Sequence, residues 1–169
     1  MNQNQTEKIV LEKQAAELFA TCYQREFDVP VSFVSNNVPA KPDVTCRVGN
    51  DLVDIEIAHL YGSQAEAQQI LGKSLDEKTQ AELNLLEAET NTDDRLVRAL
   101  NRILANKANK HYDGDNVWLV IRNANPQWQR HNIQNNLARI SIPDGHPFKQ
   151  VWLIGDYDGA SGLVFLNSL

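Results

Sequence analysis

Residues 41–62 have the sequence KPDVTCRVGNDLVDIEIAHLYG, which predicts two antiparallel strands joined by a tight turn. The dipeptide Gly49-Asn50 favours a two-residue hairpin turn, because glycine readily adopts the positive φ that such turns need. Centring the turn on this pair places Asp43 opposite Glu56. Successive side chains alternate between the faces of a strand. One face of the hairpin is therefore apolar throughout, with Val44, Cys46, Val48, Val53, Ile55 and Ile57.

The second face of the hairpin is polar and carries Asp43, Asp54 and Glu56. A slip of one residue would bury these carboxylates, so the apolar pattern sets the register. Directly opposed like charges destabilise a sheet by up to about 1 kcal/mol unless a cation lies between them. Mg²⁺ binds one or two carboxylates together with water and phosphate oxygens. Asp43 and Glu56, with the Ile57 carbonyl, thus form a candidate metal site; the alternative is a solvated face whose acids pair with a base such as Arg47.

Residues 42–43 (Pro-Asp), the hairpin and residues 54–58 (Asp-Ile-Glu-Ile-Ala) together resemble the signature of the PD-(D/E)xK nuclease-like superfamily, which includes many restriction enzymes and DNA-repair nucleases. The resemblance implies an α/β fold with a restriction-endonuclease-like αβββαβ core, in which helices flank a mixed central sheet. It also implies hydrolysis of nucleic-acid phosphodiester bonds with Mg²⁺ or Mn²⁺. Asp43 matches the PD aspartate and Glu56 the (D/E) position, so both would be catalytic and bind the metal. Ala58 stands where the family has its lysine.

A later helix supplies a candidate for that lysine. Residues 93–112, DDRLVRALNRILANKANKHY, predict a helix that begins at an acidic capping segment. Lys107 lies about 20° from Leu100 around the helix axis, near the centre of the apolar stripe. An unpaired cation there would cost several kcal/mol. Lys107 is therefore expected either to extend its amine to solvent from the last turn, where it would complement the helix dipole, or to meet a carboxylate across the interface.

The resemblance favours the carboxylate partner, because some families of the superfamily carry the catalytic lysine on the helix that follows the strand. The strand E-I-A followed by I-x-x-x-K-x-x-K-x-Y looks like this variant, with Lys107 as the migrated catalytic lysine. A glutamate on the first helix often assists the metal in this superfamily, and Glu12 borders that helix's apolar stripe; the alternative is a solvated surface glutamate. The candidate accessory residues are Glu12, Asp54, Lys110 and Arg47.

The remaining elements follow from periodicity and from turn residues. Strand 116–122 is almost continuously apolar, which is typical of a parallel strand covered on both faces. The other predicted elements are a helix over 6–26 capped by Thr6, a strand over 31–35, a polar helical insertion over about 63–88, a helix from 126 to about 140, and strands over 151–154 and 162–166. Together they predict one domain over 1–169, with a nuclease-like core over about 6–122 and a C-terminal helix and strands over 126–169.

Composition supports a soluble globular domain, since 42% of the 169 residues are hydrophobic and 22% are charged. No apolar run approaches the roughly 20 residues of a membrane span, and the N-terminus lacks the form of a secretory signal. We therefore expect a cytoplasmic protein without a membrane partner. Several reactive residue types have ordinary explanations: Cys22 and Cys46 as reduced core residues, His59 as a satisfied core histidine, His131 as solvated, and Asp156 and Asp158 as parts of a surface turn.

The formal net charge of −6 argues against tight, non-specific binding of nucleic acid, which usually requires a basic face. Two hypotheses therefore stand beside a metal-dependent nuclease that acts on DNA or RNA. One is a catalytically inactive nuclease-fold domain that binds protein or nucleic acid, favoured by Ala58 and by the net acidity. The other is an unrelated α/β protein whose hairpin matches by chance. The facing pair Asp43 and Glu56, with Lys107, favours the nuclease.

Overall fold

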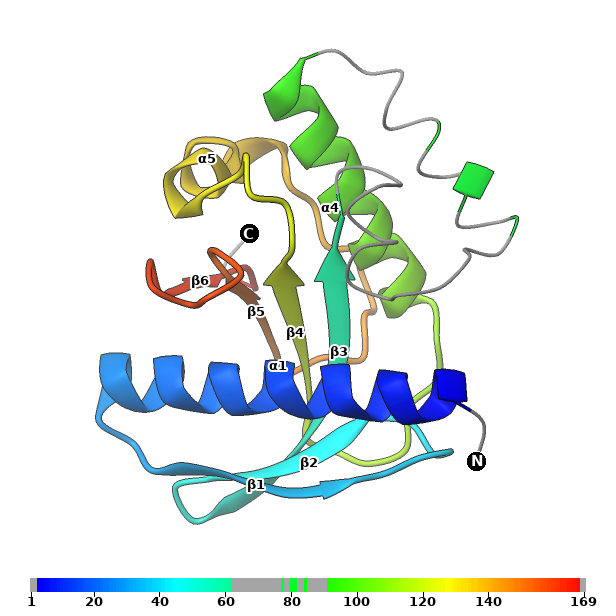
Figure 1. Cartoon of the computed structure of the whole chain (residues 1–169), viewed down its shortest axis with the longest axis vertical. Coiled ribbons are helices and arrows are strands. Elements are labelled where there is room, and N and C mark those ends of the chain that lie inside the picture. Colours follow the sequence, from blue (N-terminus) through cyan, green and yellow to red (C-terminus); the bar gives the residue numbers. More distant parts are fainter. Residues whose placement is uncertain (1–2, 62–76, 78–79, 82–83, 85–90, 168–169) are drawn as a thin grey trace.

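A single mixed sheet of six strands organises the protein, in a computed structural model that describes residues 3–61, 77, 80, 81, 84 and 91–167 (Figure 1). The strands are β1 (Val31–Asn36), β2 (Val44–Val48), β3 (Asp51–Leu60), β4 (Val117–Asn123), β5 (Gln150–Ile154) and β6 (Leu163–Phe165). The helices whose bounds lie within the described residues are α1 (Gln3–Phe27), α4 (Thr92–Ala108), α5 (Arg130–Asn135) and the 3₁₀ helix η1 (Leu137–Arg139). The predicted α/β class is confirmed.

The strands lie in the sheet in chain order, and their directions divide the sheet into two parts. β1, β2 and β3 pair antiparallel, β3, β4 and β5 pair parallel, and β6 returns antiparallel to β5. The predicted hairpin register is confirmed, because Thr45 pairs with Asp54 and Cys46 with Val53, around a turn in which Gly49 has a φ of 60°. β2 begins at Val44, so Asp43 lies one residue before the strand.

Helices cover both faces of the sheet. α1 crosses one face, while α4 and α5 lie on the other (Figure 1). The apolar side of the hairpin packs under α1, together with Phe19, Trp118 and Trp152. The face toward α4 buries Leu96, Leu100, Leu104 and alternate residues of β4 and β5. Among the residues described, no helix is long and apolar enough to cross a membrane.

Three predicted helix boundaries were wrong. α1 starts at Gln3, so Thr6 lies inside the helix and does not cap it. α4 ends at Ala108, where the prediction continued to residue 112. The helix predicted from 126 to 140 is replaced by a turn, α5 and η1. The predicted insertion over 63–88 lies almost entirely outside the described residues.

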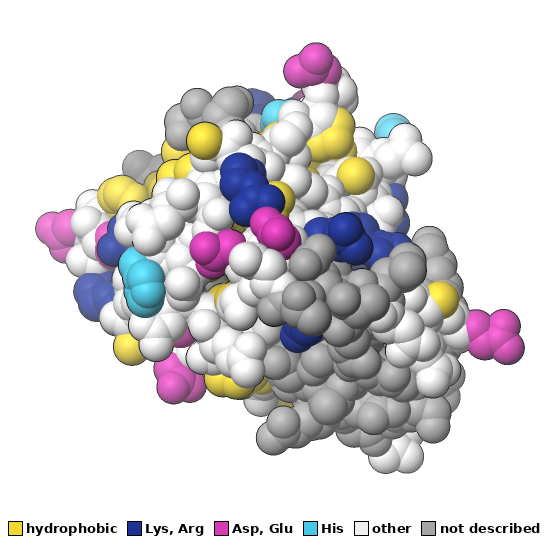
Figure 2. All heavy atoms as spheres, turned by 90° about the horizontal axis from the view of Figure 1, so that it is seen from above, with side chains coloured by type: hydrophobic (Ala, Val, Ile, Leu, Met, Phe, Trp, Pro, Cys, Tyr) yellow, Lys and Arg dark blue, Asp and Glu magenta, His cyan; other side chains and the backbone are white. Residues whose placement is uncertain are grey.

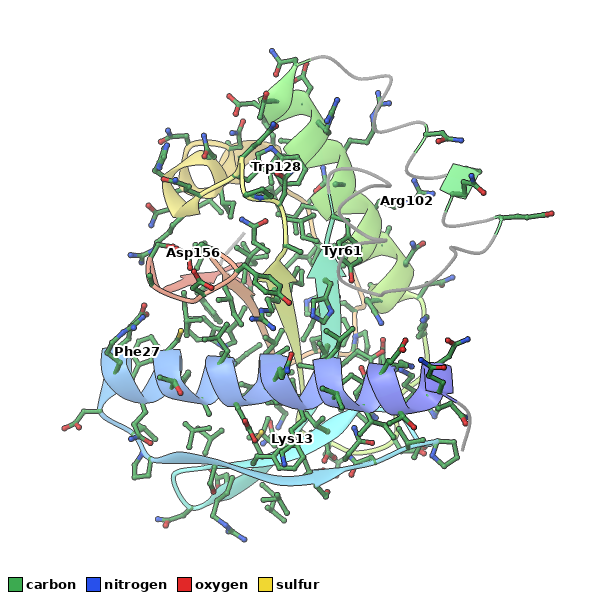
Figure 3. The ribbon with its side chains drawn as sticks, in the orientation of Figure 1. Lys13, Phe27, Tyr61, Arg102, Trp128 and Asp156 are labelled. Carbon is green, nitrogen blue, oxygen red and sulfur yellow. The ribbon has the colours of Figure 1, made fainter. Side chains whose placement is uncertain are left out.

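The turn before α5 is held by asparagine side chains that compete with helical hydrogen bonds. Asn123 Oδ1 accepts from the amide of Asn125, and Asn125 Oδ1 accepts from the amide of Gln127. Asn123 also donates to the Trp128 carbonyl, at 2.8 Å. These bonds fix an irregular turn and present Trp128 to the space between α4 and α5 (Figure 3), where its indole donates to the carbonyl of Thr92.

The two remaining surface predictions are confirmed. His131 is exposed on α5. Asp156 lies in the loop between β5 and β6 (Figure 3), and its carboxylate accepts a hydrogen bond from the amide of Ser161 at 3.0 Å. Asp156 and exposed Asp158 therefore belong to a surface turn.

Native thiols are expected to be unreactive. Cys22 and Cys46 are both free and buried, and burial raises the pKa of Cys46 to about 11 and also raises that of Cys22. Because the thiolate is the reactive form, we expect native protein to react with an aromatic disulfide reagent at least about a hundredfold more slowly than a free thiol. Both thiols should react rapidly in guanidinium chloride. Rapid reaction of a native thiol would contradict the buried positions.

Candidate active site

Two buried carboxyl groups meet at the open end of the β2–β3 hairpin. Asp43, just before β2, is 3% exposed, and Glu56 in β3 is completely buried. Asp43 Oδ2 accepts a hydrogen bond from the amide of Ile57 at 3.0 Å. This bond ties Asp43 to the neighbouring strand and brings its carboxyl beside that of Glu56, which lies on the face of the sheet toward α4. The structure thus brings the two predicted metal-binding residues together.

Lys107 reaches the same place from the last turn of α4. Its Nζ lies 3.0 Å from Glu56 Oε2, and its side chain is only 17% exposed. Of the two expectations for this lysine, a carboxylate partner across the interface is therefore confirmed. The hydroxyl of Tyr112 donates to the same Glu56 oxygen at 3.1 Å and lies 3.2 Å from the Lys107 carbonyl. Lys107 and Tyr112 together fix one oxygen of Glu56.

Sequence reasoning missed Lys41, the second cation of the site. Its ammonium contacts Asp43 Oδ1 and lies 3.6 Å from Glu56 Oε1, so it spans both carboxyls. Tyr112 was also not predicted as a site residue, although it is the final residue of the pattern K-x-x-K-x-Y. For Lys41 the available signal was its position directly before the Pro-Asp pair.

Burial and neighbouring charges shift the pKa values of Asp43 and Glu56 in opposite directions. Burial raises the pKa of the Glu56 carboxyl; the Lys107 ammonium opposes this and adjacent Asp43 adds to it, so the pKa lies above its ordinary value. Burial alone would also raise the pKa of Asp43, but hydrogen bonds with the neighbouring carboxyl, Lys41 and the Ile57 amide outweigh it, and the pKa is lowered. A pair that retains one proton would therefore hold it on Glu56.

Glu12 of α1 is buried beside this pair, so its alternative interpretation as a solvated surface residue was wrong. Its side chain is 4% exposed, accepts a hydrogen bond from Asn36 at 3.2 Å and pairs with Lys8 at 3.5 Å. Burial raises the pKa of Glu12, and the negative charge of Asp43 raises it further. α1 therefore brings a third acid within electrostatic range of the site.

The other candidate accessory residues contribute less to the site. Arg47 is exposed and pairs with Leu52 near the turn, about 13 Å along the strand from Asp43. Asp54 accepts a hydrogen bond from Thr45 at 2.7 Å. Lys110 is exposed beyond the end of α4, and the positive charge of Lys107 lowers its pKa, so it lies at the edge of the cluster.

His59 differs from the prediction of a satisfied core histidine. It lies near the carboxyl end of β3, its ring stacks on that of Tyr61, and Nε2 is buried without a hydrogen-bond partner among the described residues. Burial, aided by the charge of Arg122, lowers the pKa of His59 to about 4. The ring is therefore neutral at pH 7.

Comparison with known proteins gave no match to a family model, to a curated protein or to a solved structure. Function is therefore inferred from the geometry and chemistry of the site.

A divalent cation fits the residues of this site. With both carboxyls ionised, Glu56 Oε1 is buried and no donor within the described part of the chain hydrogen-bonds to it. Two carboxylates completed by water and substrate oxygens form an adequate Mg²⁺ site. The described residues contain no group of three or more His, Cys, Asp or Glu side chains that could hold a metal ion. The candidate donors for a metal would therefore be Asp43 and Glu56, with the Ile57 carbonyl as a third.

Charge is mixed on the side of the molecule seen from above in Figure 1. On the described part of that face, Lys and Arg side chains are interspersed with Asp and Glu and form no continuous basic surface (Figure 2). This distribution agrees with the net charge of −6. The described part of this face has no continuous basic surface. A polyanion bound there would therefore contact only a few separate Lys and Arg side chains.

Proposed function

We propose that the protein is a metal-dependent nuclease-like enzyme that hydrolyses phosphodiester bonds of DNA or RNA, with a restriction-endonuclease-like core. The observation that carries this proposal is the ion pair of Lys107 with Glu56 beside Asp43, in which the cation comes from α4 and not from β3. Among the elements with described bounds, the order α1-β1-β2-β3-α4-β4 supports the same proposal, since it is the αβββαβ order that the resemblance implies.

Each residue has a distinct role in the proposed reaction. Asp43 and Glu56 would hold Mg²⁺ or Mn²⁺, which when bound lowers the pKa of a coordinated water and polarises the phosphate. Lys107 supplies a fixed positive charge where negative charge develops in the transition state. Tyr112 orients Glu56 through a hydrogen bond of 3.1 Å. When ionised, Glu12 adds negative charge near Asp43 and thereby favours a cation in the site.

A second candidate function is a non-catalytic domain that binds protein or nucleic acid on the same fold. The position of Lys41 favours it, because its ammonium already contacts Asp43 and lies 3.6 Å from Glu56 and so occupies the space of a metal. Ala58 in place of the strand lysine favours it as well. The two functions differ in whether the purified protein cleaves DNA or RNA.

The test is a cleavage assay with single- and double-stranded DNA and RNA substrates at low salt. We expect cleavage with Mg²⁺ or Mn²⁺ and none with excess chelator, because hydrolysis depends on the metal held by Asp43 and Glu56. An Asp43→Asn variant should be inactive, while Asp54→Asn, which alters a carboxylate bonded to Thr45, should retain activity. If no substrate is cleaved under any of these conditions, the binding-module hypothesis replaces the enzyme.

A further inference from the structure

In each of the two carboxylates, one oxygen accepts a hydrogen bond from a donor other than Lys41, and the other oxygen faces Lys41. Asp43 Oδ2 is taken by the amide of Ile57, and Glu56 Oε2 by Lys107 and Tyr112. The remaining oxygens are Asp43 Oδ1, in contact with the Lys41 ammonium, and Glu56 Oε1, 3.6 Å from it. These two oxygens, one from each acid, thus face the same amine.

Lys41 differs from Lys107 in ways that suit an exchangeable cation. Lys107 is 17% exposed; its backbone belongs to the last turn of α4 and its ammonium pairs with Glu56. Lys41 is 34% exposed and belongs to the segment between β1 and β2, so its ammonium can turn into solvent without displacing a helix. A buried pair of acids needs a cation or a proton between them, and Lys41 provides that cation from within the chain.

We propose that Lys41 is an internal counter-ion which occupies the divalent-metal site in the metal-free protein and leaves it when the metal binds. The inference rests on the metal site of the proposed function. Lys41 holds Asp43 and Glu56 in a geometry ready for the metal, and it competes with the metal for the same two oxygens. Its role is positioning, and the exchange does not require that the protein cleave anything.

If Lys41 exchanges with the metal, Lys41→Met should destabilise the metal-free protein and strengthen its binding of metal. Without metal, the variant should melt at a lower temperature than wild type, because the buried acids lose their cation. In titrations with Mn²⁺ alone, its Kd should be about tenfold lower than that of wild type, because no amine must be displaced. Lys41→Arg keeps the charge and should restore the melting temperature of the metal-free protein while keeping Mn²⁺ binding as weak as in wild type or weaker.

Lys149→Met is the matched control, because it removes the same charge from an exposed position ahead of β5 and should change neither quantity. Equal Mn²⁺ affinity in wild type and Lys41→Met would overturn the exchange while leaving the proposed metal site in place. If neither protein binds Mn²⁺, both the exchange and the metal site are wrong. Tighter binding by Lys41→Met in a protein that cleaves no nucleic acid would support the exchange and count against the nuclease.

Discussion

Replacing Lys107 by alanine is expected to lower the rate of phosphodiester cleavage by about a hundredfold or more, the scale seen when one electrostatic partner of a transition state is removed. The amine lies 3.0 Å from Glu56 in the proposed catalytic centre. The fold should survive, since truncation of a lysine in the last turn of α4 opens no large cavity. Initial cleavage rates with saturating metal would measure the effect on catalysis, and thermal melting would measure the effect on the fold.

Lys110→Ala is the natural control for this experiment. It removes the same charge three residues later, from an exposed side chain at the edge of the cluster. Its effect on cleavage should be much smaller. If wild type and Lys107→Ala cleave equally well, the idea of a migrated lysine is wrong.

Glu56→Gln is expected to abolish the stabilisation that Mg²⁺ or Mn²⁺ gives to wild type. A ligand that binds only the folded state raises the melting temperature by mass action, by roughly 5–10 °C for a chain of this size at about a hundred times Kd. Glutamine has nearly the same shape but lacks the charge of the buried oxygen that no donor reaches among the described residues. Differential scanning fluorimetry across a metal titration would record the loss.

Asp54→Asn serves as the control for Glu56→Gln. It neutralises another carboxylate of the same strand, one that accepts a hydrogen bond from Thr45. This variant should keep the full metal-dependent shift. An equal shift in wild type and Glu56→Gln would place any bound metal elsewhere in the protein and would remove the basis for assigning Asp43 and Glu56 to it.

The hairpin and its register could be predicted because the determining information is local. Alternating apolar residues set the face, and Gly49-Asn50 sets the turn, so pairs such as Thr45 with Asp54 followed directly. The angle of Lys107 on the apolar stripe could be predicted from helix geometry, but that geometry left its amine either in solvent or beside a carboxylate, and the resemblance favoured the carboxylate. The register of the hairpin and the angle of Lys107 depend only on the period of one element, so both could be derived from local sequence.

The parts that escaped prediction depend on tertiary contacts or on irregular chain. Lys41 lies between strands, where no period indicates the direction of a side chain. Glu12 could be placed at the border of an apolar stripe, but its burial depends on how α1 crosses the sheet near Asp43. The helix predicted to start at residue 126 failed because side chains of Asn123 and Asn125 bond to nearby backbone groups, an energetic competition that propensity alone does not resolve.

The origin of Lys107 on α4 also affects when the protein could first become active during its synthesis. Glu56 and Lys107 are 51 residues apart in the chain, so a nascent chain can close the hairpin long before the lysine has emerged from the ribosome. Even then the amine reaches the acids only after α4 has docked against the sheet. Under the proposed function, the growing chain carries its acids without its lysine, and cleavage begins only once α4 has docked.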